Sequence, residues 1–479
     1  MVLGTTSGAG KSWLATALCR WYARRGLSVA PFKAQNMSNN ARVVEGGEIG
    51  SAQYFQALAA RAAPEVRMNP LLLKPERDDH SQVVLLGRVD AALSRAGWRG
   101  RSASVWPVLS EALDALRARH DVVVIEGAGS PAEINLRDSD VVNMRVALHA
   151  DAACLLVTDI DRGGAFAHLY GTWSLLPPHE RALLRGFVLN KFRGDPGLLD
   201  PGPRMLQDLT GIPTVATLPM LWDHGLPEED GVFDATPPAA AAGAQTTVAI
   251  VAYPRISNLD EFQPLKNVAG LRLTWVRSPQ ALAALQPADW IVLPGSKHTS
   301  SDLAWLRAQG LDAAVASHAA RGGRVLGLCG GLQMLGEALV DAHGIDGNAA
   351  GLGLLPLVTE FVPDKTVRRT RARFGTLAGS WSALSQCQAE GYEIHHGRTA
   401  LHPAFDRAGQ GGREVLPGLG WQNAAGNVLG LYLHGLFEQP AVLEALFGAR
   451  ARALDDVFDG LADLVDRHFA PGCLESLVA

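Results

Sequence analysis

The chain has 479 residues, of which 47% are hydrophobic and 19% charged, a balance typical of a folded protein with two domains rather than of a disordered chain. Its formal charge of −5 gives no general attraction to nucleic acid or to an anionic membrane, so we expect small molecules as partners. The five cysteines are scattered and form no CxxC pair, which argues against a structural zinc site and favours a reducing cytoplasm.

The first predicted elements begin at the amino terminus. Met1 leads directly into Val2, Leu3 and a glycine-rich loop, which leaves no room for a secretory signal. Apolar runs such as 121–125 fall far short of the roughly 20 residues that span a bilayer. We therefore expect a cytoplasmic protein that does not insert into a membrane.

Short apolar runs alternate with helical patterns through the first half of the chain, which predicts a parallel α/β sheet. A helix is predicted directly after the first loop, because Leu14, Ala17, Leu18 and Trp21 recur at helical spacing. The runs that predict buried strands are 27–32, 121–125, 154–158, 186–189 and 214–218.

The glycine-rich loop GTTSGAGKS precedes that helix, with one residue more than the standard P-loop between its first glycine and the GK pair. Small residues let the backbone N–H groups of the loop, including those of Thr5 and Gly10, turn toward phosphate oxygens. Lys11 supplies positive charge at the β- and γ-phosphates, and the Ser12 hydroxyl can ligate Mg²⁺. The loop therefore predicts a site for ATP and Mg²⁺, and a glycine-rich turn that binds nothing is the disfavoured alternative.

Three more charged residues are candidates for the same site. Glu126 follows the predicted strand 121–125, and carboxyl ends of parallel strands border the crevice that binds ligands, so we predict a magnesium-associated acid. Lys33 is predicted to meet a γ-phosphate or a substrate carboxylate, and Glu48 is a second candidate acid. The alternatives are a turn cap for Glu126 and solvated side chains for Lys33 and Glu48. Together these groups suit transfer of a phosphoryl group to a carboxylate, which gives an acyl phosphate.

Residues 234–247, DATPPAAAAGAQTT, predict a linker, because they contain two prolines and no large apolar side chain. The linker separates domain 1–233 from a second α/β domain, 248–440, and the apolar spacing of 441–479 predicts a helical extension. In the second domain, a helix is predicted from Leu332, and strands are predicted at 248–252, 271–276, 290–293 and 324–328.

The run RVLGLCGGLQMLG places Cys329 between a predicted strand and a predicted helix. Such a sharp turn is a nucleophile elbow, in which the helix amino terminus favours the thiolate. Backbone N–H groups at Gly330 and in the Gly295 loop are expected to form an oxyanion hole. A small buried hydrophobic residue is the alternative for Cys329.

A cysteine elbow needs a general base, and His434 in GLYLHGLFE is the predicted one. His395 and His396 compete, although paired histidines beside a tyrosine more often serve binding or packing. Glu438 is a candidate to orient His434, but a spacing of four residues can place it on the wrong face.

In this order, the motifs resemble those of the cobyric acid synthase family of cobalamin biosynthesis. The resemblance implies a domain similar to dethiobiotin synthetase, which makes a carboxyl phosphate with ATP and Mg²⁺, and then a class I type glutaminase domain with Cys329 and His434 as its catalytic pair. This chain has Gly8 where family members often carry an aspartate. The motifs that carry the resemblance are GTTSGAGKS, FKAQNMSNNA, GGEIGSAQ, IEGAGS, TDIDRGGAFA, GFVLNKFRGD, LPGSKHT, GLCGGLQMLG, GYEIHHGRT and YLHGLFE.

The resemblance further implies a corrinoid substrate. Members of the family amidate the b, d, e and g carboxylates of adenosylcobyrinic acid a,c-diamide with nitrogen from glutamine. Such a polyanion needs a local group of basic side chains to bind it. One basic run is a candidate for this group, and the alternative is that the run is only a solvated cationic strand. The run DKTVRRTRARF offers Lys365, Arg368, Arg369, Arg371 and Arg373.

Two other functions stay open. One is a cobyrinic or hydrogenobyrinic acid a,c-diamide synthase, which has a similar architecture. The other is a regulatory P-loop ATPase, although the early loop lysine of the partitioning type is absent between Gly4 and Gly10. The sequence carries no signal for an oligomeric state.

Overall fold

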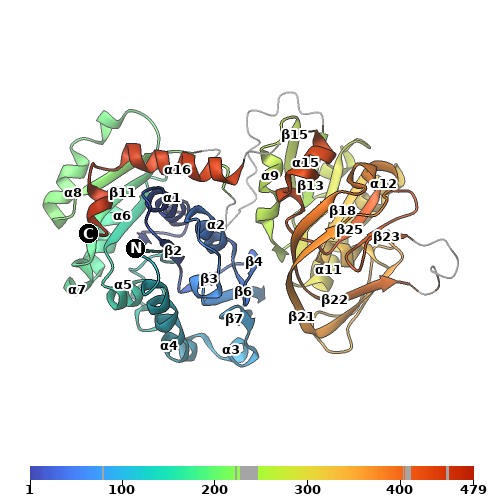
Figure 1. The fold of residues 1–479 in the computed structure, drawn as a ribbon, viewed down its shortest axis with the longest axis horizontal. Helices are drawn as coiled ribbons and strands as arrows, with labels where there is room; N and C mark the ends of the chain where they lie inside the picture. Colours follow the sequence, from blue (N-terminus) through green and yellow to red (C-terminus); the bar gives the residue numbers. More distant parts are fainter. Residues whose placement is uncertain (78–79, 222–223, 227–245, 403, 405–411, 449–452) are drawn as a thin grey trace.

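The computed structural model describes all residues except 78–79, 222–223, 227–245, 403, 405–411 and 449–452. The chain folds into two α/β bodies that lie side by side, one from the blue-to-green half of the sequence and one from the yellow-to-orange half (Figure 1). We call the part up to Leu226 the amino-terminal domain and the part from Thr246 to Gly448 the second domain. Of the predicted linker, Thr246 and Thr247 belong to a strand, and 234–245 lie outside the described residues.

A parallel sheet forms the centre of the amino-terminal domain. Its order is β1-β10-β11-β12, and β2 and β9 pair in parallel beside it, joined by a parallel bridge between Val2 and Glu126. The strands are nearly all buried, as expected when helices cover both faces. The sequence prediction of a parallel sheet is confirmed, with strands β1 (Val2–Gly4), β2 (Val29–Phe32), β9 (Val122–Ile125), β10 (Cys154–Asp159), β11 (Leu184–Phe192) and β12 (Thr214–Pro219).

Smaller strands and the helices complete this domain. The helix α1 (Lys11–Arg24) starts directly at the end of the glycine-rich loop and buries the predicted apolar face. The other helices are α2 (Ser51–Ala59), α3 (Ala91–Arg95), α4 (Trp98–Arg117), α5 (Met144–Ala150), α6 (Ala165–Leu175), α7 (Pro178–Arg181) and α8 (Gly202–Thr210). The smaller strands are β3 (Gln35–Met37), β4 (Ala41–Val44), β5 (Gly47–Gly50), β6 (Leu71–Arg77), β7 (His80–Leu85) and β8 (Arg88–Val89).

The second domain has a sheet of order β15-β13-β16-β18-β25-β24-β23, parallel from β15 to β25 and antiparallel beyond. Its strands are β13 (Thr246–Val251), β15 (Leu271–Val276), β16 (Trp290–Leu293), β18 (Arg324–Leu328), β23 (Arg413–Leu416), β24 (Gly420–Gln422) and β25 (Val428–Leu431). Its helices are α9 (Gln263–Lys266), α10 (Pro279–Ala283), α11 (Thr299–Ala308), α12 (Leu311–Ala320), α13 (Gly330–Leu335) and α15 (Pro440–Phe447). The helix predicted from Leu332 therefore begins two residues earlier, because it starts directly after Cys329.

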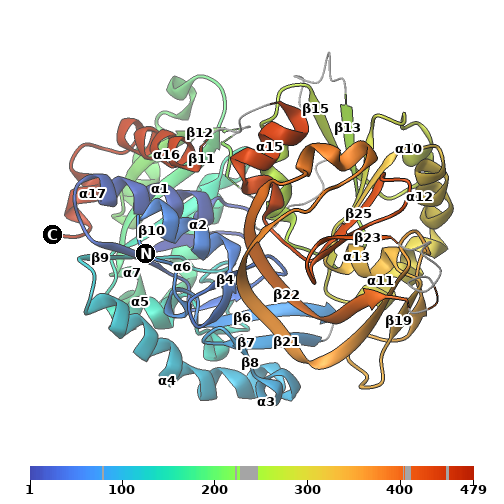
Figure 2. The ribbon, with the colours of Figure 1, turned by 45° about the vertical axis from the view of Figure 1, so that its right-hand side comes forward.

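A long antiparallel hairpin of the second domain faces the amino-terminal domain. Its strands β21 (Leu357–Arg373) and β22 (Gln388–Leu401) lie beside β4, β6 and β7 (Figure 2). The hairpin belongs to a sheet with β19 (Ala338–Val340) and β20 (Ala349–Ala350), and a short antiparallel pair, β14 (Ile256–Ser257) with β17 (Gly295–Ser296), lies near the parallel strands. This hairpin brings the basic run into the interface between the domains.

The carboxy-terminal helices divide between the two domains. Val442 and Leu443 of α15 pack in the core of the second domain, whereas α16 (Leu454–His468) returns to the amino-terminal domain and packs on α1 (Figure 1). Arg20 of α1 pairs with Asp455 at 2.9 Å and with Asp459 at 2.8 Å. The short α17 (Cys473–Ser476) follows it. The amino-terminal domain is therefore built from both ends of the chain.

Candidate functional site

The glycine-rich loop turns tightly between β1 and α1. Gly10 has a φ of 98°, and a Cβ there would lie 2.1 Å from the amide nitrogen of Asn190, so the position needs glycine. The Lys11 amine reaches back over the loop and donates to the carbonyls of Thr6 at 2.9 Å and Gly129 at 3.2 Å. The hydroxyls of Thr5 and Thr158 lie 2.9 Å apart at its base. This is the compact, amide-rich turn that a phosphate group requires.

Glu126 lies at the centre of a buried polar cluster beside that loop. Its carboxylate accepts from the Ser12 hydroxyl at 2.7 Å, the Lys33 amine at 2.9 Å and the Gln56 amide at 2.6 Å. Burial alone would raise the pKa of Glu126, but Lys33 and these hydrogen bonds lower it, so the group is ionised near neutral pH. The structure thus brings Ser12, Lys33 and Glu126 together. A hydroxyl and a carboxylate fit Mg²⁺, which takes few protein oxygens and keeps several waters.

Glu48 has a different place from the one we predicted. It is buried at the interface between the domains, where its two oxygens pair with Lys74 at 2.6 Å and with Lys365 of β21 at 2.5 Å. Burial would raise the pKa of Glu48, but the two lysines lower it. Because both oxygens are engaged by cations, Glu48 is an interface anion rather than a second acid beside Ser12 and Glu126. Lys365 is 317 residues away in the chain, so no local pattern could reveal this pairing.

The basic run lines a cavity of about 690 Å³ between the domains. Three of its five predicted cations border this cavity, and they are Lys365, Arg368 and Arg369. Arg88 of the amino-terminal domain lines it from the other side. Arg371 instead pairs with Glu390 on the surface of the hairpin.

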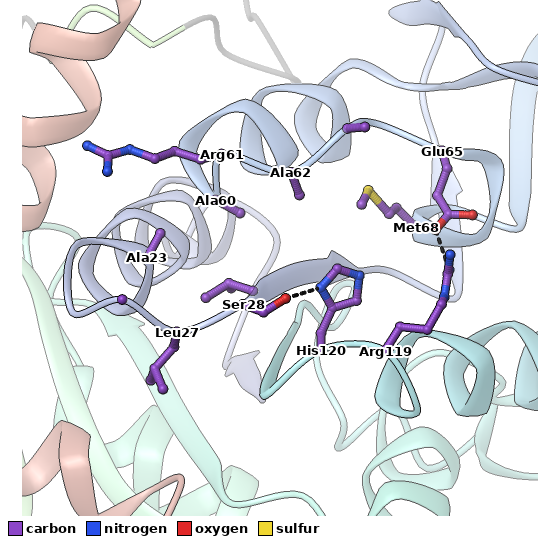
Figure 3. Close-up of a pocket in the computed structure, with 13 residues that line it drawn as sticks. Ala23, Leu27, Ser28, Ala60, Arg61, Ala62, Glu65, Met68, Arg119 and His120 are labelled. Carbon is purple, nitrogen blue, oxygen red and sulfur yellow. Dashed lines mark hydrogen bonds and ion pairs between the residues drawn. The ribbon is translucent and has the colours of Figure 1, made fainter.

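A second cavity, of about 440 Å³, lies at the opposite edge of the sheet from the P-loop, where β2 begins. Figure 3 shows Ser28 paired with His120 and Glu65 paired with Arg119 around it. None of the predicted site residues lines this cavity.

Cys329 occupies a strained turn between β18 and α13. Its backbone has φ 52° and ψ −107°, a conformation that costs energy in a residue with a side chain and is typical of functional turns. The neighbouring glycines are needed for space, because a Cβ at Gly331 would lie 1.8 Å from the Leu293 carbonyl and one at Gly330 would lie 2.8 Å from the Ser296 nitrogen. The predicted nucleophile elbow is thus present in the backbone geometry.

His434 lies three residues beyond β25, and its imidazole interacts with the sulfur of Cys329, whose thiol donates to the Ile394 carbonyl at 3.6 Å. Its Nδ1 lies 3.1 Å from Oε1 of Glu261 and 3.2 Å from the amide nitrogen of Asn258. Burial alone would lower the pKa of His434, but the Glu261 carboxylate and the Cys329 sulfur raise it to about 10. Cys329, His434 and Glu261 therefore form a buried line of thiol, imidazole and carboxylate.

Glu438 does not orient His434. Its carboxylate pairs with Nη1 of Arg42 at 2.5 Å, whereas the carboxylate at His434 is that of Glu261. The ring of His434 faces η5 (Leu259–Phe262), which carries Glu261. Glu438, four residues after His434, instead faces Arg42. The sequence carries no signal for Glu261, which stands in the unremarkable run NLDEF and is 173 residues from its partner.

The two glycines of the predicted oxyanion hole lie beside this line. Gly295 belongs to β17, and a Cβ there would lie 3.2 Å from Cε1 of His434. Gly330 starts α13 directly after Cys329 and passes against the Ser296 nitrogen. Gly295 therefore lies next to the imidazole of His434, and Gly330 lies next to Cys329 in the chain.

The competing histidines face other groups. His395 stacks on Tyr432 with 3.9 Å between ring centroids, and its Nδ1 lies 2.8 Å from the Gly397 carbonyl. His396 has its Nδ1 at 3.2 Å from the Val362 carbonyl. Burial, with Lys365 and Lys297 nearby, lowers the pKa of His396 to about 4. These contacts leave His434 as the imidazole at Cys329.

Two family models match the chain. Residues 1–231 match the CobQ/CobB/MinD/ParA nucleotide binding domain, and residues 247–442 match the CobB/CobQ-like glutamine amidotransferase domain. These matches confirm the predicted order of a P-loop domain and a glutamine amidotransferase domain. In the described part of the chain, no helix is both long and apolar enough to cross a membrane.

Relatives match over the full length. The chain is 72% identical over 480 residues to the cobyric acid synthase of Polaromonas naphthalenivorans (strain CJ2). The matched region covers 100% of this chain and 99% of the relative. It is 74% identical over 481 residues to the cobyric acid synthase of Variovorax paradoxus (strain S110), with the same coverage. A solved glutamine amidotransferase covers 45% of this chain and 98% of its own length, at 16% identity and a TM-score of 0.31. The chain belongs to the cobyric acid synthase family and is an amide-forming ligase of the glutamine amidotransferase type.

Proposed function

We propose that this enzyme amidates the b, d, e and g carboxylates of adenosylcobyrinic acid a,c-diamide, using ATP and the amide nitrogen of glutamine, and so makes adenosylcobyric acid in the cytoplasm. The observation that carries the proposal is the identity of 72% and 74% to full-length cobyric acid synthases. The joint presence of a P-loop cluster and a Cys–His–Glu line in one chain supports it.

The glutaminase half releases ammonia by covalent catalysis. The Cys329 sulfur, with its proton held by His434, attacks the amide carbon of glutamine, and the backbone N–H groups at Gly295 and Gly330 stabilise the oxyanion. His434 then gives the proton to the leaving nitrogen, so ammonia departs and a thioester remains. Water, deprotonated by His434, hydrolyses the thioester to glutamate. Glu261 holds the imidazole in place throughout and stabilises its protonated form, which the raised pKa of His434 supports.

The P-loop half activates the carboxylate. A substrate carboxylate oxygen attacks the γ-phosphorus of ATP, ADP leaves, and ammonia then displaces phosphate from the acyl phosphate to give the amide. Lys11 and Lys33 offset the charge of the two anions that must approach each other. Ser12 and Glu126 would hold Mg²⁺, which would add positive charge at the phosphates. Thr5 and Gly10 contribute to the phosphate cradle.

The cavity between the domains is the proposed docking place for the periphery of the corrinoid. Its cations Arg88 and Arg369 suit a ligand that carries several carboxylates, whereas the guanidinium of Arg368 already pairs with Glu393. Arginine forks bind carboxylates in two parallel hydrogen bonds, which gives orientation as well as attraction.

Mass spectrometry of the products tests the proposal. Purified protein with glutamine, Mg-ATP and the a,c-diamide should add four amides in succession, consuming one ATP and one glutamine for each. Starting from the unamidated corrin, a product that stops at the diamide would assign the a,c-diamide synthase activity instead. ATP hydrolysis with no amidation of any corrinoid would favour the regulatory P-loop ATPase.

A further inference from the structure

A cation of the amino-terminal domain is buried at the interface, against acidic side chains of the second domain. Arg42, in β4, is only 1% exposed. Its Nε donates to Oδ2 of Asp260 at 2.8 Å, its Nη2 contacts the same oxygen, and its Nη1 pairs with Oε1 of Glu438 at 2.5 Å. A buried guanidinium is unfavourable unless anions pair with it, and here both anions come from the other domain. The ion pairs of Arg42 can therefore form only when the two domains are docked.

Both partners of Arg42 lie on turns that hold His434. Asp260 is adjacent to Glu261 in η5, and Glu261 contacts Nδ1 of His434 through Oε1 and the Gly435 nitrogen through Oε2 at 3.3 Å. Glu438 ends η7 (Leu436–Glu438), the turn that follows His434. The guanidinium therefore joins the turn that carries the orienting carboxylate to the turn that follows the imidazole.

The neighbours of Arg42 reach the same turn. The Ala41 nitrogen donates to the side-chain oxygen of Asn258 at 3.2 Å, and the Asn258 amide nitrogen lies 3.2 Å from Nδ1 of His434. The Leu259 nitrogen donates to the side-chain oxygen of Asn40 at 2.9 Å. Three consecutive residues of the amino-terminal domain thus contact the start of η5.

An aromatic ring links Arg42 to His434 from a second side. The Tyr392 ring stacks on the His434 ring with 5.2 Å between centroids and 19° between planes. The Cζ of Arg42 lies 5.1 Å from the centroid of the Tyr392 ring, within cation–π range. The His434 imidazole therefore contacts Glu261 on one side and Tyr392 on the other, and Arg42 lies next to both the Glu261 turn and the Tyr392 ring.

We propose that Arg42 is a positioning residue for the glutaminase reaction: the ATP-binding domain, through Arg42, holds Glu261 and His434 in the geometry that Cys329 requires. This inference rests on the proposed glutaminase function. It makes glutamine hydrolysis dependent on docking of the domain that consumes the ammonia, so an undocked second domain wastes little glutamine. Arg42 does not touch glutamine or the corrinoid, and it acts through η5, η7 and the Tyr392 ring.

The test uses the full chain with Arg42→Ala, Arg42→Lys and a matched control, Tyr54→Phe. The control removes another hydrogen bond across the interface, from Arg369 to the Tyr54 hydroxyl at 3.2 Å, without touching η5 or η7. For Arg42→Ala we expect kcat for glutamine hydrolysis to fall by at least about 10-fold, with KM changed less than about twofold, because positioning for proton transfer matters most in the transition state. Arg42→Lys should recover part of the loss, since it keeps the charge but not the fork. Amidation from added ammonia should continue in all three variants.

A second readout distinguishes positioning from general stability. The rate of Cys329 alkylation by iodoacetamide, followed on the Cys329 peptide, should shift in its pH dependence in Arg42→Ala and stay unchanged in Tyr54→Phe. An unaltered kcat for glutamine in both Arg42 variants would overturn the proposal. Loss of the ammonia reaction together with glutamine hydrolysis would overturn it too, because it would assign Arg42 to the interface as a whole. If Arg42→Ala does not fold, the same measurements of kcat for glutamine and of the ammonia-dependent rate are made on Arg42→Lys, and they are judged in the same way. An unsubstituted enzyme that hydrolyses no glutamine would overturn the proposed function as well.

Discussion

Nδ1 of His434 lies 3.1 Å from Oε1 of Glu261, although 173 residues separate the two in the chain. Both side chains are almost fully buried, so little water screens the pair. This carboxylate, contributed by a short turn far from the histidine, defines the environment of the predicted base.

Glu261→Gln should lower glutamine-dependent synthesis while sparing synthesis from ammonia. The amide keeps a similar shape but removes the negative charge that stabilises the imidazolium, so we expect a loss of about 10- to 100-fold in kcat for glutamine, within the range typical of general acid–base catalysis. The pKa of His434, now about 10, should also fall. Steady-state kinetics with both nitrogen sources check this, with the exposed Glu444→Gln as control. Equal losses with glutamine and ammonia would contradict it.

Cys329→Ala and His434→Ala should abolish glutamine-dependent synthesis and leave synthesis from high ammonia intact. The thiolate and its base are needed only to free nitrogen from glutamine. Product formation is measured with each nitrogen source, and circular dichroism verifies the fold. A folded variant that lost the ammonia reaction would show that the division of labour between the domains is wrong.

Lys11→Ala and Glu126→Ala should suppress synthesis with both nitrogen sources. These residues act on phosphoryl transfer, where charge stabilisation is the main catalytic resource, and free ammonia cannot replace them. The measurement is ATP consumption and amide formation at saturating ammonia. A normal ammonia-dependent rate in Glu126→Ala would remove that residue from the magnesium site.

Glu48→Gln should destabilise the protein rather than change its use of Mg²⁺. The substitution leaves Lys74 and Lys365 buried without their shared anion, and breaking a buried pair costs about 3 to 5 kcal/mol. Urea unfolding measures the loss. The Mg²⁺ concentration for half-maximal activity should stay as in the unsubstituted enzyme, and a large rise would return Glu48 to the magnesium site.

The pH dependence of stability should carry a signature of His434. Its pKa is raised from 6.5 to about 10 in the folded protein, so the folded state holds this proton more tightly than the unfolded state does. The stabilisation is complete below pH 6.5 and is lost as the pH rises toward 10. Urea midpoints measured between these values should therefore decrease more steeply for the unsubstituted enzyme than for His434→Gln. Parallel slopes would contradict the raised pKa.

The sequence predicts those parts of the two sites that local geometry produces. A strand, a glycine-rich turn and a helix bring Lys11 and Ser12 into one loop, and the same order of elements places Cys329 at a sharp turn between a strand and a helix. Glu126 was predictable because parallel strands end at one edge of the sheet. In each case the residues that act together are close in the chain or follow strands of one sheet.

The remainder depends on pairings between distant segments. Glu261 meets His434 only after the second domain has folded, and Arg42 meets Glu438 and Lys365 meets Glu48 only after both domains have docked. Charged residues in solvated loops look the same in a sequence as charged residues that will be buried in ion pairs. The open question for Glu438 and the displaced prediction for Glu48 both follow from this ambiguity.

The return of α16 to α1 means that the chain passes between the domains twice, once between Leu226 and Thr246 and again between Gly448 and Ala453. In topological terms the glutaminase is an insertion in the nucleotide-binding domain. A single cut in the first crossing leaves the nucleotide-binding domain attached to the glutaminase only through the packing of α16 on α1, and the two crossings together keep Arg42 at a high effective concentration near its acceptors. A stand-alone nucleotide-binding fragment made by simple truncation would expose the apolar side of α1, whereas one that fuses 453–479 behind residue 226 would keep it covered.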